Sequence, residues 1–122
     1  MSEDYPDWVQ GHLKRLYDQH KACVDQPDLR HQHFKQLNEI AHDMKGQGGT
    51  FGFPLISQFA DSLYGFTRPR EDYASAEVDL VKAHVDAMNA VIKGRIKGPG
   101  GAIGQQLSET LAKAIERYSK RA

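Results

Sequence analysis

Apolar residues recur along this chain at spacings of three and four, which is the pattern of amphipathic helices, and strand-like alternation is absent. Five segments are predicted as helices: residues 4–24, a segment that ends near 51, one that begins at 54, then 73–97 and 103–120. Proline or glycine lies in the connections, as is typical of helix ends. Short connections favour antiparallel neighbours. We therefore predict an all-α fold: an antiparallel, up-and-down four-helix bundle with an additional helix, about five helices in all.

The apolar stripes of these helices identify the side chains that should form the core. The inward residues are expected to be Trp8, Leu13, Leu16, Tyr17 and Val24; Phe34, Leu37, Ile40, Ala41 and Met44; Leu55, Ile56, Phe59, Ala60 and Leu63; Val78, Val81, Val85, Met88, Ile92 and Ile96; and Ile103, Leu107, Leu111, Ala114, Ile115 and Tyr118. Pro27 should end the first helix, Asp28 can cap the second, and Pro54 suits the start of the third. The fifth helix is expected either to pack on the bundle or to serve a partner.

The composition is that of a single domain spanning residues 1–122. Its 16 basic and 16 acidic residues cancel, so net charge favours neither nucleic acid nor a membrane surface as a partner. No segment approaches the roughly 20 apolar residues of a membrane span, and the acidic start differs from a signal peptide. The lone Cys23 excludes an internal disulfide and is expected to be a small apolar side chain within a helix. A cytoplasmic protein is therefore expected.

The stretch IAHDMKGQGGTFGF, residues 40–53, holds four glycines where the apolar stripe indicates a continuing helix. The stripe passes through Gly48 to Phe51, so this helix is predicted to run to Phe51 and to stop at Gly52. Gly48 falls on the inward face, where it would allow close approach of a neighbouring helix. Gly46 falls on the outward face, where a glycine costs about 1 kcal/mol relative to alanine and packing gives no reason for it. Gly46 therefore calls for a functional explanation.

His42 is predicted to be an exposed histidine with a cation one turn away. It lies about 140° around the helix from Leu37, the centre of the apolar stripe, and Lys45 and Gly46 follow it on the same side. A neutral imidazole is a competent nucleophile near pH 7, and nearby positive charge helps to keep it neutral. A lysine can follow the oxygens of a moving phosphoryl group, and a glycine leaves room for another protein to approach. These features indicate phosphoryl transfer.

The sequence His-Asp-Met-Lys-Gly that begins at His42 resembles the histidine phosphotransfer (HPt) domain. The family signature is a histidine followed by lysine at plus three, glycine at plus four and a further glycine at plus ten, and all three positions match here. The apolar run over residues 55–63 is similar to the next helix of the family. The resemblance covers roughly residues 28–97, so the first and fifth predicted helices lie outside its strongest part.

This resemblance implies a four-helix bundle that exposes its active histidine on the second helix. It implies a phosphorelay protein that exchanges a phosphoryl group with the aspartate of response-regulator receiver domains, or receives it through a sensor histidine kinase. Such domains have no ATP-dependent kinase activity of their own, and the chain holds no P-loop motif. No cofactor is implied on this chain, and Mg²⁺ is expected on the partner receiver domain. A monomer without nucleic-acid or membrane partners is expected.

The resemblance also implies roles for individual residues. His42 is the phosphoacceptor, Lys45 stabilises the charge of the phosphoryl group, and Gly46 provides clearance for receiver docking. Many members place a glutamine on the facing helix, near the imidazole. Tyr64 occupies that position here, so its phenol is a candidate substitute for the glutamine hydrogen bond. Arg68, one turn later, is a candidate for additional positive charge.

Two other interpretations remain open. Glu39 and His42 form the Glu-x-x-His step of di-iron bundles, but a second copy is absent from the sequence and His42 points away from the apolar stripe. A non-catalytic helical adaptor that binds receiver domains or kinases is also compatible with the chain, although such a relative would be expected to lose the histidine. The remaining histidines have weaker context: His12, His20, His31 and His33 are expected at the surface, and His84 is expected to be partly buried.

Overall fold

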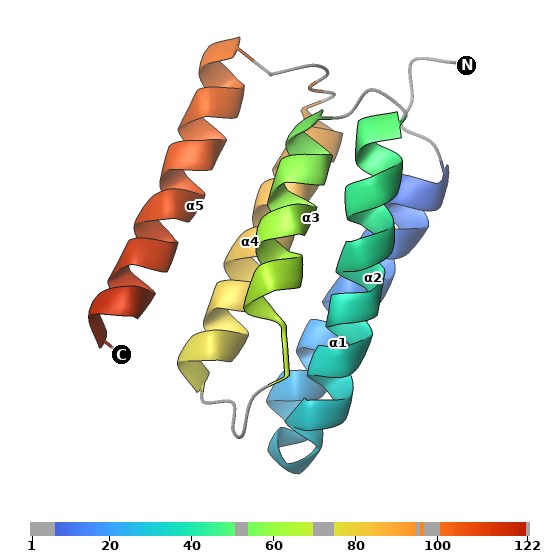
Figure 1. Cartoon of the computed structure of the whole chain (residues 1–122), viewed down its shortest axis with the longest axis vertical. Coiled ribbons are helices and arrows are strands. Elements are labelled where there is room, and N and C mark those ends of the chain that lie inside the picture. Colours follow the sequence, from blue (N-terminus) through green and yellow to red (C-terminus); the bar gives the residue numbers. More distant parts are fainter. Residues whose placement is uncertain (1–6, 51–53, 70–74, 95, 97–100, 122) are drawn as a thin grey trace.

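The computed structural model describes the backbone of residues 7–50, 54–69, 75–94, 96 and 101–121, and all regular structure within this part of the chain is helical. Five α-helices and a short 3₁₀ helix follow one another: α1 (Asp7–Asp25), η1 (Pro27–Leu29), α2 (Arg30–Thr50), α3 (Pro54–Phe66), α4 (Ser75–Lys93) and α5 (Gly101–Arg121) (Figure 1). The predicted all-α fold of five helices is therefore confirmed. None of the described helices combines the length and apolar character needed to cross a membrane.

The first four helices close into a bundle. Figure 1 shows that each helix runs opposite to the one before it. α1 and α3 each contact both α2 and α4, and α5 packs on α4 at the outside of this group. Leu111 of α5 is buried, and Leu107 and Ile115 are half-buried against the same core. Of the two roles predicted for the fifth helix, packing on the bundle is the one observed.

The stripes of α2 and α3 lie at the centre of the core, where every side chain predicted to point inward from these two helices is buried. Four α4 residues are buried as predicted, namely Val78, Val81, Val85 and Met88. In α1, Leu13 and Leu16 are buried, while Trp8 and Tyr17 are half-buried against the core. Because one face of α2 is fully committed to the core, its opposite face is exposed to solvent, and that face holds His42.

Two predicted core residues are exposed instead. Val24 is 53% exposed, while its neighbour Cys23 is buried. Leu16 and Cys23 share the inward stripe of α1, and Val24 is rotated from Cys23 by about 100°. Ile103 is 58% exposed. It belongs to the first turn of α5, the end of that helix that extends past α4 in Figure 1.

α4 ends at Lys93, earlier than the predicted residue 97. Gly94 follows in a turn, and a Cβ atom there would lie 3.1 Å from the Ala90 carbonyl oxygen. The backbone N–H of Ile96 donates to the Val91 carbonyl (3.0 Å), a six-to-one bond typical of helix C-termini. Ile96 is therefore half-buried after the helix rather than within it.

The other helix ends also refine the prediction. Asp28 lies within η1 and α2 begins at Arg30, so Asp28 does not occupy the predicted cap position. α5 begins at Gly101, whose φ of +56° is a conformation that favours glycine. α2 continues through the glycine run as predicted and is described to Thr50. Its expected end at residues 51–52 and the start of the first helix at residues 4–6 lie outside the described residues, as do the surroundings of the glycine at 48, which was predicted to face inward.

Candidate functional site

His42 lies on the exposed side of α2, away from the buried face that includes Leu37 and Ala41. Its side chain is 66% exposed, and its Nδ1 atom lies 3.7 Å from Oδ1 of Asp43. A carboxylate at this position favours a proton on Nδ1, which leaves the lone pair of a neutral imidazole on Nε2. The exposed ring is therefore able to present Nε2 as a nucleophile.

Lys45 and Gly46 follow His42 by one turn, and both are exposed. Nζ of Lys45 lies 3.3 Å from Oδ1 of Asp61 on α3, an anionic partner that the sequence pattern did not identify. The Lys45 carbonyl accepts a 2.8 Å hydrogen bond from Oγ of Ser57, which ties this turn of α2 to α3. A side chain at Gly46 would enter open space, because a Cβ atom placed there meets nothing within 4 Å among the described residues.

The ring of Tyr64 on α3 contacts this group of residues. Its centroid lies 5.5 Å from that of the His42 ring, with the two planes inclined by 49°. Nζ of Lys45 lies 5.0 Å from the Tyr64 centroid, and Cζ of Arg68 lies 5.9 Å from it. Tyr64 is therefore next to the imidazole, as the resemblance implied, and Arg68 contacts the same Tyr64 ring. The contact between Tyr64 and His42 is between the two rings, whereas the phenol of Tyr64 was the candidate that the resemblance offered for a hydrogen bond.

A hydrogen-bond network fixes the end of α3 against α2. Nδ2 of Asn38 donates to the Tyr64 carbonyl (2.8 Å) and to Oγ1 of Thr67 (3.1 Å). Thr67 is buried, and its hydroxyl donates to the Leu63 carbonyl (2.8 Å). Asn38 lies one turn before His42, so the network sets the position of Tyr64 relative to the imidazole. Short polar side chains of this kind are common at surfaces, so the pattern alone did not reveal the network.

An open cavity of about 380 Å³ lies beside the imidazole, lined by Asn38, Glu39, His42, Asp43 and Tyr64. Two of these residues are carboxylates, and the cations Lys45 and Arg68 lie at the Tyr64 ring that forms one wall. Among the described side chains, no group of three or more His, Cys, Asp or Glu is arranged to hold a metal ion. The site therefore offers an exposed imidazole beside an aromatic ring over which two cations lie.

The remaining histidines differ in how far they are buried. His84 is fully buried, which corrects the prediction of partial burial; its Nδ1 lies 2.8 Å from the Leu80 carbonyl and its Nε2 2.8 Å from Oγ of Ser62. His31 is exposed as predicted, whereas His12, His20 and His33 are half-buried. These three rings lie where neighbouring side chains cover part of their surface, as Trp8 does for His12 through an edge contact at 6.0 Å. Burial lowers the pKa of His12 and of His20.

The lone cysteine is part of the core. Cys23 is fully buried, as predicted for a small apolar side chain in a helix. Burial raises the pKa of its thiol to about 11, an effect that the nearby Arg30 guanidinium opposes. A thiol that stays protonated at neutral pH is a poor nucleophile, so Cys23 is not a candidate for the chemistry of this protein.

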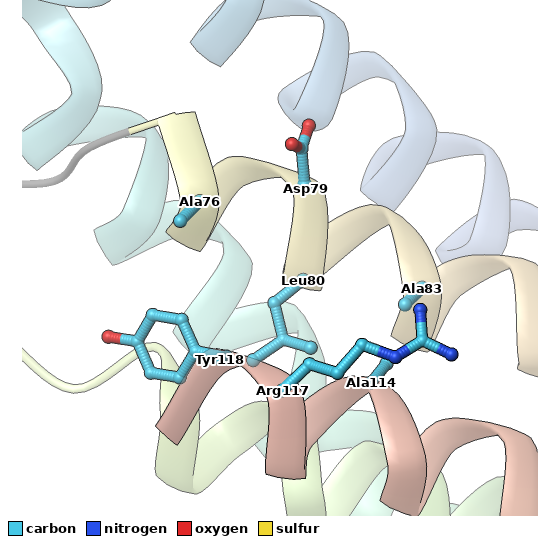
Figure 2. A pocket seen from close by; sticks show the side chains of 7 residues that line it. All are labelled: Ala76, Asp79, Leu80, Ala83, Ala114, Arg117 and Tyr118. Atoms are coloured by element: carbon cyan, nitrogen blue, oxygen red, sulfur yellow. The ribbon is translucent and has the colours of Figure 1, made fainter. Parts of the chain in front are cut away.

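A smaller cavity of about 160 Å³ lies between α4 and α5 (Figure 2). Leu80 and the small side chains of Ala83 and Ala114 line it, together with Asp79 and Arg117. Figure 2 shows the Asp79 carboxylate pointing away from α5, so the two charged groups do not converge on the cavity. We interpret this cavity as a packing gap between two helices that meet through small residues.

No model of a known protein family, no curated protein and no solved structure matches this chain. A functional assignment therefore depends on the fold and on the residues of the site. Together they define a helical bundle that presents the exposed His42 with Lys45 and the open position at Gly46 one turn away.

Proposed function

We propose that this protein is a histidine phosphotransfer protein of a two-component phosphorelay, in which His42 accepts a phosphoryl group from the aspartate of one receiver domain and passes it to another. The observation that carries this proposal is the exposed His42 imidazole with Lys45 one turn away and open space at Gly46. The resemblance of this segment to HPt domains supports the same function. The proposal includes a cytoplasmic monomer whose partners are receiver domains or a sensor histidine kinase.

In the proposed transfer, Nε2 of the neutral His42 attacks the phosphorus of the receiver's aspartyl phosphate. The N–P bond forms as the P–O bond to the aspartate breaks, and the bonding electron pair leaves with the aspartate carboxylate. The proton on Nδ1 stays on the ring. The Asp43 carboxylate, 3.7 Å from Nδ1, stabilises the positive charge that the ring acquires. Transfer to a second receiver is the reverse of this step, and each receiver supplies its own Mg²⁺.

The surroundings of His42 suit this reaction because phosphoryl transfer depends on positioning and on stabilisation of charge. Lys45 is a compact charge on a flexible stem, able to follow the phosphoryl oxygens. Its ion pair with Asp61 is solvent-exposed, and exposed pairs are weak, so Lys45 can exchange this partner for a phosphoryl group at little cost. The open space at Gly46 leaves room for a receiver loop to approach the ring.

The direct test is labelling of the wild-type protein by phosphorylated receiver domains and, separately, by phosphoramidate. The label should be stable in base and labile in acid, as expected of phosphohistidine. His42→Gln should abolish it, whereas His31→Gln, which changes an exposed histidine on the same helix, should keep it. Circular dichroism checks that both variants remain helical.

Three outcomes would decide against the proposal. Retention of label in His42→Gln would place the phosphoryl group elsewhere. Labelling of the wild-type protein by ATP alone would indicate an intrinsic kinase rather than a carrier. Binding of receiver domains without any label on the wild-type protein would favour the non-catalytic adaptor.

A further inference from the structure

The Tyr64 ring is the common neighbour of the imidazole and of both nearby cations. His42 and Lys45 come from α2, while Arg68 follows the end of α3. The ring centroid lies 5.5 Å from the His42 ring, 5.0 Å from Nζ of Lys45 and 5.9 Å from Cζ of Arg68. An aromatic face attracts cations within about 6 Å of its centroid. Three groups from two parts of the chain therefore meet at one side chain.

Tyr64 is also more buried than either cation. It is half-buried and packs against the hydrophobic core, and its backbone carbonyl accepts the hydrogen bond from Asn38. Lys45 and Arg68 are exposed side chains with long, flexible stems that lose rotamer freedom when they are held in one place. A fixed ring that attracts both cations reduces the number of positions that they sample beside His42.

The charges around the site make the positions of Lys45 and Arg68 important for an anionic phosphoryl group. Three carboxylates lie around the same site: Glu39 and Asp43 line the cavity beside the imidazole, and Asp61 pairs with Lys45. Lys45 and Arg68 are the two cations that lie over the Tyr64 ring at this site. An incoming phosphoryl group, itself anionic, therefore meets less negative charge when both cations are held near the imidazole.

We propose that Tyr64 is a positioning residue for phosphoryl transfer, acting through its ring face to hold Lys45 and Arg68 beside the His42 imidazole. This inference rests on the proposed function of His42. It assigns the effect to the aromatic face and gives the phenol hydroxyl no part in it. The ring forms no bond during the reaction; it places the two charges that meet the phosphoryl group.

The test compares Tyr64→Phe, which keeps the ring, with Tyr64→Leu, which keeps an apolar side chain but removes the aromatic face. Rates of label transfer from a phosphorylated receiver and from phosphoramidate are measured at fixed donor concentration, together with thermal midpoints. Tyr64→Phe should react within about twofold of wild type, and Tyr64→Leu should be slower by about fivefold or more with both donors, since two exposed cation–π contacts are lost. Gly11→Gln, an exposed substitution on α1, controls for nonspecific effects.

A double-mutant cycle separates positioning from a general structural effect. Tyr64→Leu is introduced into a Lys45→Ala, Arg68→Ala background, in which the ring has no cations to hold. The rate ratio between leucine and tyrosine at residue 64 should fall there to less than about twofold. A ratio as large as in the wild-type background would overturn the proposal, because the ring would then act independently of the cations.

The remaining outcomes distinguish this inference from the proposed function. Normal labelling of both the wild-type protein and Tyr64→Leu would overturn the positioning role and leave His42 as phosphoacceptor. Equal slowing in Tyr64→Phe and Tyr64→Leu would show that the hydroxyl acts, which overturns the ring account. Absence of label on the wild-type protein with every donor would overturn the proposed function and this inference together.

Discussion

Nζ of Lys45 lies 3.3 Å from Oδ1 of Asp61, so the lysine one turn from the proposed phosphoacceptor has an anionic partner on the neighbouring helix. The two side chains are 44% and 63% exposed, and ion pairs in such surroundings contribute about 0–1 kcal/mol to stability. The pair therefore contributes little to the stability of the fold, and Asp61 is better understood as a competitor for Lys45. A phosphoryl group on His42 would compete with Asp61 for Lys45.

Asp61→Asn should consequently favour the phosphorylated protein. Removing the competing carboxylate frees Lys45 for the phosphoryl group, so the equilibrium with a phosphorylated receiver should shift toward phosphohistidine and the phosphohistidine should persist for longer. The measurement is the distribution of label between receiver and protein at equilibrium. Asp18→Asn, which breaks the exposed Lys14–Asp18 pair on α1, is the matched control and should leave that distribution unaltered. An unaltered distribution in Asp61→Asn would argue against the competition.

Lys45→Ala should change chemistry more than stability. Substitutions at exposed positions usually change the free energy of unfolding by less than about 0.5 kcal/mol, so the thermal midpoint should stay close to that of wild type. Transfer to His42 should slow, or the phosphohistidine lifetime should shorten, because the phosphoryl oxygens lose their nearest cation. Lys82→Ala on α4 also removes an exposed lysine with one ion-pair partner, and it should affect neither rate nor lifetime. An unfolded Lys45→Ala variant, or wild-type kinetics, would contradict this role.

His84 should make the stability of the fold depend on pH. Its Nδ1 must donate to the Leu80 carbonyl, since that oxygen only accepts, and a neutral ring then accepts from Ser62 at Nε2. Burial lowers the pKa of His84 below its ordinary value of 6.5, and the hydrogen bond to Leu80 opposes this effect. The unfolded chain thus binds a proton more readily than the folded protein. Stability is fully present above pH 6.5 and is lost as pH falls from there through the lower pKa of the folded state.

The measurement is the free energy of unfolding by denaturant between about pH 8 and pH 5.5, where most carboxylates stay ionised. The wild-type protein should lose stability toward the acidic end, and His84→Gln should lose less over the same range. Burial also lowers the pKa of His12 and of His20, so the difference between the two proteins, rather than either curve alone, isolates His84. Parallel curves would show that His84 does not titrate with unfolding. A lower overall stability of the variant would not affect this comparison.

The helices and their central stripes were predictable because helical periodicity is a local property of the sequence. Val24 and Ile103 were misplaced because burial at the edge of a stripe depends on where the neighbouring helix lies and how far it extends. α4 ends at Lys93, just before Gly94, and apolar spacing alone extended the predicted helix past this glycine.

The same distinction applies to the site. The relationship of His42 to Lys45 and Gly46 lies within one turn of a helix, so spacing alone predicted it. The contacts with Asp61 and Tyr64 depend on how α3 packs against α2, and the sequence offers no local signal for that packing. The resemblance placed residue 64 near the imidazole and offered its phenol as a candidate for a hydrogen bond. A position in a family indicates where a residue lies. It does not indicate which part of a different side chain makes the contact.

Gly46 allows a test in which stability and docking should move in opposite directions. It is exposed within α2, and a Cβ atom there would meet nothing within 4 Å among the described residues. Gly11 has the same properties within α1. Replacing an exposed glycine inside a helix with a good helix former stabilises by about 0.5–1 kcal/mol. Gly46→Gln and Gly11→Gln should therefore both raise the thermal midpoint.

Only Gly46→Gln should weaken receiver affinity and transfer, because its new side chain projects one turn from the proposed phosphoacceptor His42. Phosphoramidate needs little clearance and should still label His42 in both variants. Thermal midpoint, receiver affinity and phosphoramidate labelling are therefore measured together on the two proteins. If Gly46→Gln lost stability while docking stayed intact, the glycine would serve the bundle rather than the partner. If both variants docked equally well, the open space at Gly46 would have no part in recognition. The clearance account requires that both variants are more stable than wild type and that Gly46→Gln alone docks more weakly. Gly46 would then lower the stability of the helix but leave room for the receiver.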